Sequence, residues 1–455
     1  MTEAERPGGE VAILGLGKSG TAAARLLLAD GKRVYVSDSG SSPALEATAR
    51  QLRDLGAAVD VGGHDLARIA RASRVVASPG IDPAAPPIAA AREAGKPLVS
   101  EIEIALSYLE GTRIIAVTGT NGKTTTTALI GHILRGLREN AVDAGNIGTP
   151  LSDIARRDDH PDWIALEMSS FQLHDTPSLA PDIGVLTNLS PDHLDRYPTA
   201  EEYYSDKSLL FANADDDSRW VLNADDERVM RMAAGIAGTK SGFSVRHEAD
   251  AWLDNRTGAL HVLGLPLMAR NEINLLGDHN VANALAAALA VSLADARFTE
   301  PDARRDMAAA LGSFNALEHR LEVVGEKNGV QWINDSKATN VSSSLVAIAA
   351  MRKPTILLLG GRHKGEPYTG LADAIRRSVK KVIAYGEAAP MIEKDLDRVV
   401  PVERLGSDFD EVMRHARESA EPGDVVLLSP ACSSYDMFRN YEERGARFRE
   451  LAMEQ

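Results

Sequence analysis

A glycine-rich loop followed by a lysine and a row of threonines is the stretch best suited to chemistry. It reads Gly-Thr-Asn-Gly-Lys-Thr-Thr over residues 119–125, and an apolar run at 114–117 precedes it. Glycines let backbone N–H groups turn toward a phosphate, and a helix N-terminus adds partial positive charge at the same place. Lys123 adds a full charge, and the hydroxyl of Thr124 suits a Mg²⁺ ligand. The stretch therefore predicts a phosphate-binding loop between a strand and a helix.

One residue departs from the general phosphate-loop pattern. That pattern has a glycine five residues before Gly122, and Val117 stands there instead. The shorter pattern is less specific, so a glycine-rich turn that binds no ligand is the structural alternative. The order of strand, loop and helix favours a nucleotide.

Two other candidates, Glu167 and His193, follow apolar runs. Glu167 comes directly after the run 163–166, and the stretch Asp192-His193-Leu194-Asp195 follows the run 183–186. Ligands bind at the carboxyl ends of parallel strands, where a carboxylate is a natural second ligand for a phosphate-bound Mg²⁺. The structural alternatives are a helix cap or surface acid for Glu167 and a capping or core histidine for His193.

The first hundred residues predict a parallel sheet, because short apolar runs alternate there with helical patterns. We expect strands at 11–14, 33–37 and 74–77. Residues 15–20 match the pattern GxGxxG, and Asp38 lies where a ribose-binding acid would sit. Taken alone this match suggests NAD. A lone match is weak, because such glycines report only close backbone approach to a ligand or tight helix packing.

The same alternation continues through two more regions, and we place the boundaries near residues 111 and 316. In the central region we expect a helix that opens at 203–208, hairpins within 249–276 and an alanine-rich helix at 277–294. The last region has strand-like runs at 331–333, 355–359, 382–385 and 425–428. Its loops carry Lys337, Arg362 and Lys364. They supply the local positive charge that an acidic protein needs for an anionic substrate, although a solvated loop would explain any one of them.

Composition narrows the class of protein. The 455 residues carry a formal charge of −15 at pH 7, which argues against general binding to nucleic acid or anionic membranes. No apolar run approaches the length of a membrane span, and the first ten residues do not resemble a secretory signal. The single cysteine, Cys432, excludes an internal disulfide and a multi-cysteine metal site. We expect a cytoplasmic monomer that binds small molecules.

Several motifs in a fixed order resemble the Mur ligases, the ATP-dependent amino-acid-adding enzymes of peptidoglycan synthesis. They are GTNGKTT at 119–125, GNIG at 145–148, LEMSSFQL at 166–173, DHLDRY at 192–197, GDHN at 277–280, EHR at 318–320, WINDSKATN at 332–340, LLLGG at 357–361 and LLSPACSSYD at 427–436. The DSKATN and SPACSS stretches resemble the branch of this family that adds D-glutamate to UDP-N-acetylmuramoyl-L-alanine. One departure is Tyr441, where that branch usually has phenylalanine; a backbone contact there would tolerate the change.

The resemblance implies a three-domain α/β fold. Residues 1–110 would form a Rossmann-like domain that binds the UDP substrate. Residues 111–315 would form a central ATP-binding domain of the phosphate-loop type, and residues 316–455 a Rossmann-like domain that binds the amino acid. The implied reaction passes through an acyl phosphate and yields ADP and phosphate.

The resemblance also implies a role for each site residue. The ATP site would comprise Gly119, Thr120, Asn121, Gly122, Lys123, Thr124, Thr125, Asn280, Arg320 and Asp335. The UDP substrate would be held by Gly17, Asp38, Ser39, Ser78, Pro79, Gly80 and Asn146. D-Glutamate would be held by Lys337, Thr339, Lys364, Ser434 and Tyr441. Two Mg²⁺ sites would involve Thr124, Glu167, His193 and Lys207. Catalysis would use Lys123, His193 and Lys207, the last carbamylated.

Three other functions explain parts of the sequence. A folylpolyglutamate synthetase would share the central domain but not a complete first domain with its Ser-Pro-Gly-Ile loop. An NAD-linked oxidoreductase would explain residues 10–40 and nothing after 113. A non-enzymatic nucleotide switch would use the phosphate loop, but it would need neither the cationic loops of the last region nor Lys207.

Overall fold

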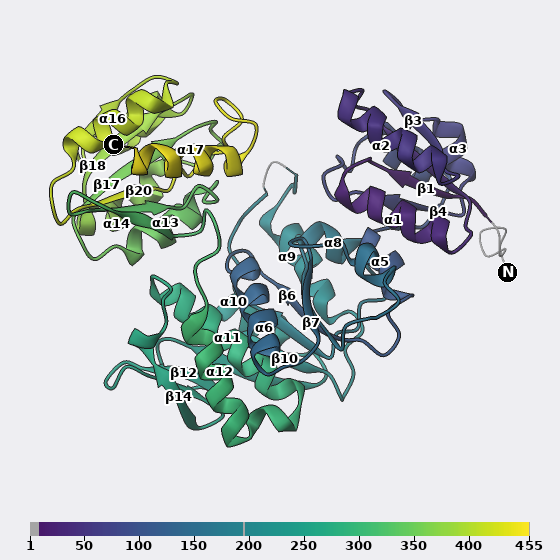
Figure 1. Ribbon diagram of the computed structural model, residues 1–455, viewed down its shortest axis with the longest axis horizontal. Helices are drawn as coiled ribbons and strands as arrows, with labels where there is room; N and C mark the ends of the chain where they lie inside the picture. The colour runs from purple at the N-terminus through teal and green to yellow at the C-terminus, as the bar shows by residue number, and fades with distance from the viewer. Residues whose placement is uncertain (1–8, 194–195, 455) are drawn as a thin grey trace. The chain divides into compact units, whose positions relative to one another are not determined.

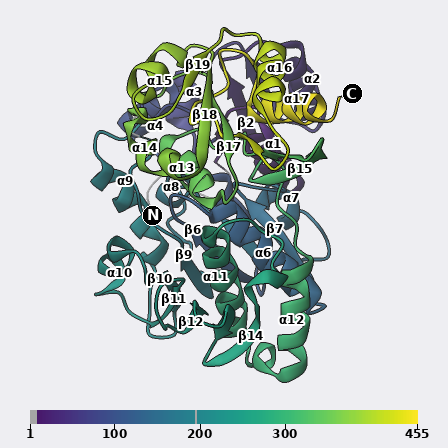
Figure 2. The same cartoon turned by 90° about the vertical axis from the view of Figure 1, so that its left-hand side faces the viewer.

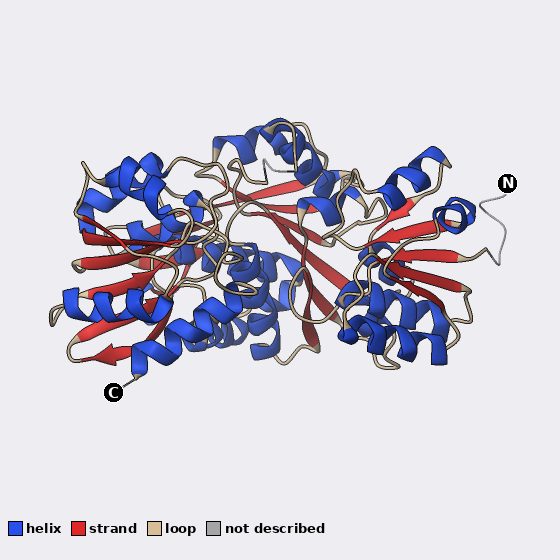
Figure 3. Ribbon diagram, turned by 90° about the horizontal axis from the view of Figure 1, so that it is seen from above, coloured by secondary structure: helices blue, strands red, loops and turns tan. Residues whose placement is uncertain are grey.

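The computed structural model describes residues 9–193 and 196–454, and its strands form three sheets with helices packed against them (Figures 1 and 3). One sheet lies within each of the three expected domains, and the expected α/β architecture is confirmed. The chain forms two compact units. Among the described residues, one comprises residues up to 268 together with 283–311, and the other comprises 269–282 together with 312–454. The predicted boundaries near 111 and 316 stay predictions.

The first sheet has five strands in the order β3-β2-β1-β4-β5, all parallel. Its strands are β1 (Val11–Leu14), β2 (Val34–Asp38), β3 (Ala58–Val61), β4 (Arg74–Ala77) and β5 (Leu98–Val99), and its helices are α1 (Lys18–Ala29), α2 (Pro43–Asp54), α3 (Leu66–Arg71), α4 (Pro86–Glu93) and α5 (Glu101–Leu106). The three strands expected from the sequence are confirmed. The order is that of a Rossmann-like half, in which ligands bind where the strand order reverses.

The central sheet has nine strands in the order β14-β13-β12-β11-β10-β9-β6-β8-β7. Its strands are β6 (Arg113–Thr118), β7 (Ala141–Gly145), β8 (Trp163–Glu167), β9 (Ile183–Leu186), β10 (Arg219–Asn223), β11 (Thr239–Ser244), β12 (Ala251–Asp254), β13 (Ala259–Val262) and β14 (Leu265–Ala269). The pairings from β7 to β12 are parallel, and β12 pairs with β13 in an antiparallel hairpin, as the sequence predicts.

Between β6 and the third sheet, the described residues form seven α-helices. They are α6 (Lys123–Gly136), α7 (Leu151–Ala155), α8 (Ser170–His174), α9 (Ala200–Ser208), α10 (Glu227–Ala233), α11 (Asp278–Ala294) and α12 (Pro301–Ser313). The prediction that a helix opens at 203–208 is wrong. Helix α9 begins three residues earlier, because the hydroxyl of Thr199 accepts a hydrogen bond from the backbone N–H of Glu202 and caps the helix. Lys207 therefore lies in the last turn of α9 and not in its first turns.

The third sheet has six strands in the order β15-β16-β20-β17-β18-β19, of which only the β15–β16 pairing is antiparallel. Its strands are β15 (Glu322–Lys327), β16 (Val330–Asn334), β17 (Thr355–Gly360), β18 (Val379–Tyr385), β19 (Val402–Arg404) and β20 (Val425–Leu428), and its helices are α13 (Val341–Ala350), α14 (Ala372–Ser378), α15 (Ala389–Leu396), α16 (Phe409–Ser419) and α17 (Tyr441–Met453). Helices cover both faces of this sheet (Figure 2). Strand β17 accordingly alternates Leu357 and Leu359 on one face with Ile356 and Leu358 on the other.

The first and central sheets share one apolar core. A single cluster of buried side chains includes Val36 of the first sheet, Ile154 of α7 and Leu166 of the central sheet. The Glu101 carboxylate at the start of α5 accepts a hydrogen bond from the backbone N–H of Ser152. Helix α5 is therefore fastened to α7, and the loops at the carboxyl ends of β1 and β4 belong to the same unit as the phosphate loop.

The glycines of the GxGxxG stretch explain how α1 packs against the loop before it. Gly15 has a φ of +99°, which favours glycine, and a Cβ on Gly20 would lie 2.1 Å from the carbonyl oxygen of Gly15. We predict that Gly20→Ala lowers the free energy of unfolding by about 1–3 kcal/mol, because the backbone carbonyl must move.

Urea unfolding followed by circular dichroism measures this effect. Gly63→Ala is the control, since a Cβ there meets no atom within 4 Å. Equal midpoints for the two variants would contradict the packing argument.

Candidate functional site

The loop between β6 and α6 requires glycine at two positions. Gly119 has a φ of +141° and Gly122 a φ of +84°. A Cβ on Gly119 would lie 2.0 Å from Oγ1 of Thr187, and one on Gly122 would lie 2.4 Å from Oδ1 of Asn283. Both residues therefore combine a left-handed backbone with a close neighbour, as expected of a loop whose backbone approaches a phosphate.

The end of β9 holds this loop in place. The Asn121 backbone N–H donates to Oδ1 of Asn188 at 2.9 Å, and Nδ2 of Asn188 donates to the Asn121 carbonyl at 2.8 Å. The Thr187 hydroxyl donates to the same carbonyl at 2.6 Å, and the Thr120 hydroxyl donates to the Ser190 carbonyl at 2.9 Å. The sequence analysis gave Asn188 no role; its position directly after a predicted strand was the available signal.

The Lys123 side chain returns to the loop that precedes it. Its Nζ donates to the carbonyls of Gly119 at 3.0 Å and of Thr120 at 2.8 Å. The next two hydroxyls, of Thr124 and Thr125, are half-buried in the first turn of α6. The structure therefore brings the ammonium group, the helix N-terminus and the hydroxyls to one loop, as the sequence predicts.

Glu167 is buried at the end of β8, with 1% of its surface exposed. One carboxylate oxygen, Oε1, accepts from Nδ2 of Asn146 at 2.9 Å. The other, Oε2, is buried and has no hydrogen-bond partner in the described part of the chain. A buried oxygen without a partner is costly unless a ligand binds it, and carboxylate oxygen suits Mg²⁺. Asn146, expected at the UDP substrate, is here the residue that orients Glu167.

Lys207 is as buried as Glu167, with 1% of its surface exposed, and is not a solvated surface lysine. Its Nζ lies 3.5 Å from Oγ1 of Thr118 and 4.7 Å from the centroid of the Tyr203 ring. Burial lowers the pKa of this amine well below its ordinary value, and the positive charge of Lys123 lowers it further. Both effects favour the uncharged form of the amine at the end of β6.

His193 follows β9 and has a φ of +55°. Its ring packs edge-on against Phe171 at 5.4 Å and lies 6.0 Å from the Tyr203 ring. Tyr203 therefore lies next to both His193 and Lys207. The next two residues of the predicted motif, Leu194 and Asp195, lie outside the described residues.

Except for Asn146, which follows β7, the residues predicted for the UDP substrate gather at the carboxyl ends of three adjacent strands, β2, β1 and β4. Asp38 fixes the first of these loops, because its two oxygens accept from the backbone N–H groups of Leu16 and Gly40, each at 2.8 Å. Gly17 is the N-cap of α1, and Ser39 follows Asp38. The Ser78 hydroxyl oxygen is buried and has no partner among the described residues.

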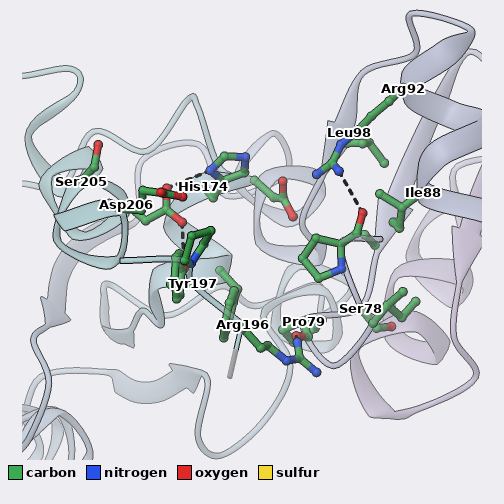
Figure 4. A pocket seen from close by; sticks show the side chains of 17 residues that line it. Ser78, Pro79, Ile88, Arg92, Leu98, His174, Arg196, Tyr197, Ser205 and Asp206 are labelled. Atoms are coloured by element: carbon green, nitrogen blue, oxygen red, sulfur yellow. Dashed lines mark hydrogen bonds and ion pairs between the residues drawn. The ribbon is translucent and has the colours of Figure 1, made fainter. Parts of the chain in front are cut away.

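A cavity of about 320 Å³ lies beside the Ser78–Gly80 loop (Figure 4). Its walls come from the loop after β4 and from α4, including Pro79 and Ile88, and from the central region, including Phe171 and Tyr197. The sequence analysis missed Arg196, which also lines this cavity, although it belongs to the motif DHLDRY.

The second unit has its own buried acid, Asp335, at the end of β16. One oxygen accepts from the backbone N–H of Leu321 at 3.2 Å, and the other accepts from the Ser429 hydroxyl at 2.8 Å. Burial raises the pKa of the Asp335 carboxyl to about 7, and the nearby charge of Arg320 acts in the opposite direction. Asn280 lies in the first turn of α11 and donates to the Leu276 carbonyl at 2.8 Å.

The residues predicted for D-glutamate form two pairs at strand ends of the third sheet. Lys337 Nζ lies 3.7 Å from the centroid of the Tyr441 ring, and Lys364 Nζ donates to the Thr339 hydroxyl at 3.5 Å. Ser434, in the loop after β20, is buried.

A fully buried arginine fixes the base of this region. Arg444 donates to the hydroxyl and carbonyl of Ser336 and to the carbonyl of Cys432, and the Ser336 hydroxyl donates to the Tyr441 carbonyl at 2.8 Å. The sequence analysis missed Arg444, because no motif that it used reaches residue 444. This hydrogen bond is to the backbone carbonyl of Tyr441, so it does not depend on whether tyrosine or phenylalanine stands there.

The donor groups of the first unit fit Mg²⁺ held mainly by phosphate oxygens. Over residues 9–193 and 196–454, no group of three or more His, Cys, Asp or Glu side chains forms a metal cluster. Mg²⁺ is usually bound through one or two carboxylates together with substrate phosphates. Glu167 with its unpartnered oxygen and Thr124 at the phosphate loop meet that requirement.

No helix in the described part of the chain is long and apolar enough to cross a membrane.

Three family models match consecutive parts of the chain. Residues 9–100 match the N-terminal domain of Mur ligases of the MurD-like type, residues 117–291 the Mur ligase middle domain, and residues 319–432 the glutamate ligase domain of Mur ligases.

Relatives match over the whole length. The UDP-N-acetylmuramoylalanine–D-glutamate ligase of Acidobacterium capsulatum is 42% identical over 99% of this chain and 97% of its own. The enzyme of the same name from Anaeromyxobacter dehalogenans is 41% identical over the full length of both.

Solved structures share the fold. A crystal structure of MurF from Acinetobacter baumannii has a TM-score of 0.61 at 14% identity and covers 100% of this chain and 93% of its own. A pseudomurein peptide ligase type C from Methanothermus fervidus has a TM-score of 0.59 at 20% identity and covers 98% of this chain and 99% of its own.

The raised pKa of Asp335 predicts a pH-dependent stability. The folded carboxyl binds a proton up to about pH 7, whereas the unfolded one releases it near pH 4. The stability that this proton contributes is present below about pH 4 and is lost as pH rises through about 7. Asp335→Asn keeps the shape without the charge, so its urea midpoint should fall less than that of the wild type between pH 5 and pH 8.

Asp408→Asn is the control for this series. It changes an acid in the same unit at a helix N-cap, where asparagine also caps. A wild-type midpoint that does not fall relative to Asp335→Asn over this pH range would contradict the prediction.

Proposed function

Because the chain belongs to the Mur ligase family, we propose that it joins D-glutamate to UDP-N-acetylmuramoyl-L-alanine and converts ATP to ADP and phosphate. Its relatives that are about 40% identical over their whole length carry the name of this activity. The structural observation that carries the proposal is the cluster at the carboxyl ends of β6 and β8. It combines Lys123 on the phosphate loop, the unpartnered oxygen of Glu167 and the buried amine of Lys207.

The chemistry requires activation of a carboxylate. A carboxylate does not react with an amine at neutral pH, so the γ-phosphoryl group of ATP passes to the carboxylate of the L-alanyl residue and forms an acyl phosphate. Transfer between two anions needs preorganised positive charge. Lys123 and the N–H groups of the loop supply it, with Thr124 and Thr125 at the helix start. When bound through Thr124 and Glu167, Mg²⁺ neutralises phosphate charge.

The remaining residues bind and orient the two other substrates. Gly17, Asp38, Ser39 and the Ser78–Gly80 loop receive the UDP end, where backbone and hydroxyl groups gather at three strand ends. In the second unit, Lys337, Thr339, Lys364, Ser434 and Tyr441 hold the carboxylates of D-glutamate. Its amine attacks the acyl phosphate, and phosphate leaves through a tetrahedral intermediate. Asn280, Arg320 and Asp335 serve the nucleotide, and His193 orients the reacting groups beside the second Mg²⁺.

One assay separates this function from its rivals. Phosphate release from ATP should require UDP-N-acetylmuramoyl-L-alanine and D-glutamate together. L-Glutamate should not replace D-glutamate, because fixed carboxylates leave one direction for the amine. Release with a folate substrate would indicate a folylpolyglutamate synthetase, and release without any second substrate would indicate a nucleotide switch. Comparable rates with the two enantiomers would refute the assignment.

Lys123→Ala tests the phosphate loop. We expect turnover to fall by about 10²–10³, the usual effect of removing one preorganised donor, without loss of the fold. Lys240→Ala, which removes an exposed lysine on β11, is the matched control and should keep full activity. A Lys123→Ala enzyme above roughly a hundredth of wild-type turnover would count against the role.

We also propose that Lys207 is carbamylated and contributes to the second Mg²⁺ site with His193. Burial beside Lys123 favours the neutral amine that must react with CO₂, and the carbamate replaces a cation with an anionic pair of oxygens. Lys207→Ala should lose nearly all activity and regain part of it with acetate or formate.

Isotope labelling gives a readout besides activity. Wild-type protein equilibrated with ¹³C-bicarbonate should show a carbamate carbon resonance that is absent from Lys207→Ala and present in Lys240→Ala. Full activity of Lys207→Ala, or the same resonance in all three proteins, would show that the carbamate assignment is wrong.

A further inference from the structure

Arg196 connects the central region with the first sheet. Its Nη1 donates to the carbonyl of Pro79 at 3.3 Å, and its Nη2 donates to the carbonyl of Gly80 at 2.9 Å. More than a hundred residues separate the arginine from these carbonyls in the sequence. In Figure 4 the guanidinium group lies beside Pro79 at the edge of the cavity. One side chain therefore fastens the loop after β4 to the loop after β9.

The two carbonyls depend on this arginine. Among the described residues, no other donor bonds to the carbonyl of Pro79 or of Gly80. The cavity of about 320 Å³ lies against the same loop, so packing does not replace the hydrogen bonds there. Bonds from a charged donor are stronger than bonds between neutral groups. The Phe171 ring lies 5.3 Å from the guanidinium carbon and keeps the group in place through a cation–π contact.

The backbone beside Arg196 is tied to the reaction centre. The N–H groups of Arg196 and Tyr197 both donate to the carbonyl of His193 at 2.9 Å. The Tyr197 hydroxyl donates to Asp206 at 2.8 Å, and Asp206 directly precedes Lys207 in α9. These hydrogen bonds connect Arg196 and Tyr197 with His193 and with the residue before Lys207.

We propose that Arg196 is a positioning residue for the nucleotide-sugar substrate. It holds the Ser78–Gly80 loop in the shape that receives the UDP end of that substrate, and it does so without contacting the substrate. This inference rests on the proposed function, because it takes the Ser78–Gly80 loop as part of the UDP site. Loss of Arg196 should weaken binding of the nucleotide sugar and leave binding of ATP and D-glutamate unchanged.

Steady-state kinetics with each substrate varied in turn test the role. Arg196→Ala should raise KM for UDP-N-acetylmuramoyl-L-alanine about tenfold, while KM for ATP and for D-glutamate and kcat stay within about twofold. Arg196→Lys, which keeps the charge but loses the forked donor, should give an intermediate KM.

Arg92→Ala is the matched control. Arg92 lines the same cavity, and its Nη1 donates at 2.9 Å to the carbonyl of Pro83, outside the loop. The Arg92→Ala variant should leave the KM values for all three substrates unchanged. An unchanged KM for the nucleotide sugar in Arg196→Ala, or the same rise in Arg92→Ala, would overturn the proposal.

Amide hydrogen exchange gives a readout that does not depend on the proposed function. In substrate-free protein, the amide of Ile81, which donates to the Ser78 carbonyl at 3.1 Å, should exchange several-fold faster in Arg196→Ala than in the wild type or Arg92→Ala. Equal exchange in all three proteins would refute the positioning role even if the ligase activity is established. If exchange is faster in Arg196→Ala alone but the wild type does not bind the nucleotide sugar, the proposed function is refuted. The hydrogen bonds from Arg196 would still be shown to stabilise the loop.

Discussion

The concentration of charge at the end of β6 is the constraint on which the rest of the site depends. Lys207 is buried with its amine 3.5 Å from Oγ1 of Thr118. The ammonium group of Lys123 donates to the carbonyl of Gly119, the residue that follows Thr118. A positive charge on Lys207 would be unfavourable here, because burial lowers the pKa of its amine and the charge of Lys123 lowers it further. Anionic ligands, or conversion of Lys207 to an anion, relieve this repulsion. The site is therefore built to receive negative charge.

The strand order of the central sheet explains how these groups come together. Strands β9, β6, β8 and β7 are consecutive neighbours, and all four are parallel. Their carboxyl ends supply in turn the Asn188 anchor, the phosphate loop, Glu167 and the Asn146 that orients it. Each strand contributes one part, so a small shift in register would displace a part of the site. A helix such as α9 then needs only to place Lys207 above β6.

The sequence predicted those parts of the site that depend on residue type and local order along the chain. It did not predict those that depend on packing between distant segments. The phosphate loop, Glu167 and the strand before each were predictable, because residue type and strand ends locate them. The burial of Lys207 was not, because nothing in a helical pattern distinguishes a lysine that points inward in the last turn from one that points to solvent. The start of α9 was missed although Thr199 followed by Glu202 is a capping signal. Asn146 and Arg196 act on groups distant in sequence, so their hydrogen bonds become visible only in the fold.

The central claim is that a substrate carboxylate attacks the γ-phosphorus of ATP at the phosphate loop. An oxygen-transfer experiment tests it most directly. With ¹⁸O in both carboxylate oxygens of UDP-N-acetylmuramoyl-L-alanine, mass spectrometry of the products should find one ¹⁸O in inorganic phosphate and one in the new amide. That result requires an acyl phosphate. Inorganic phosphate without ¹⁸O, or label recovered in AMP, would contradict the account.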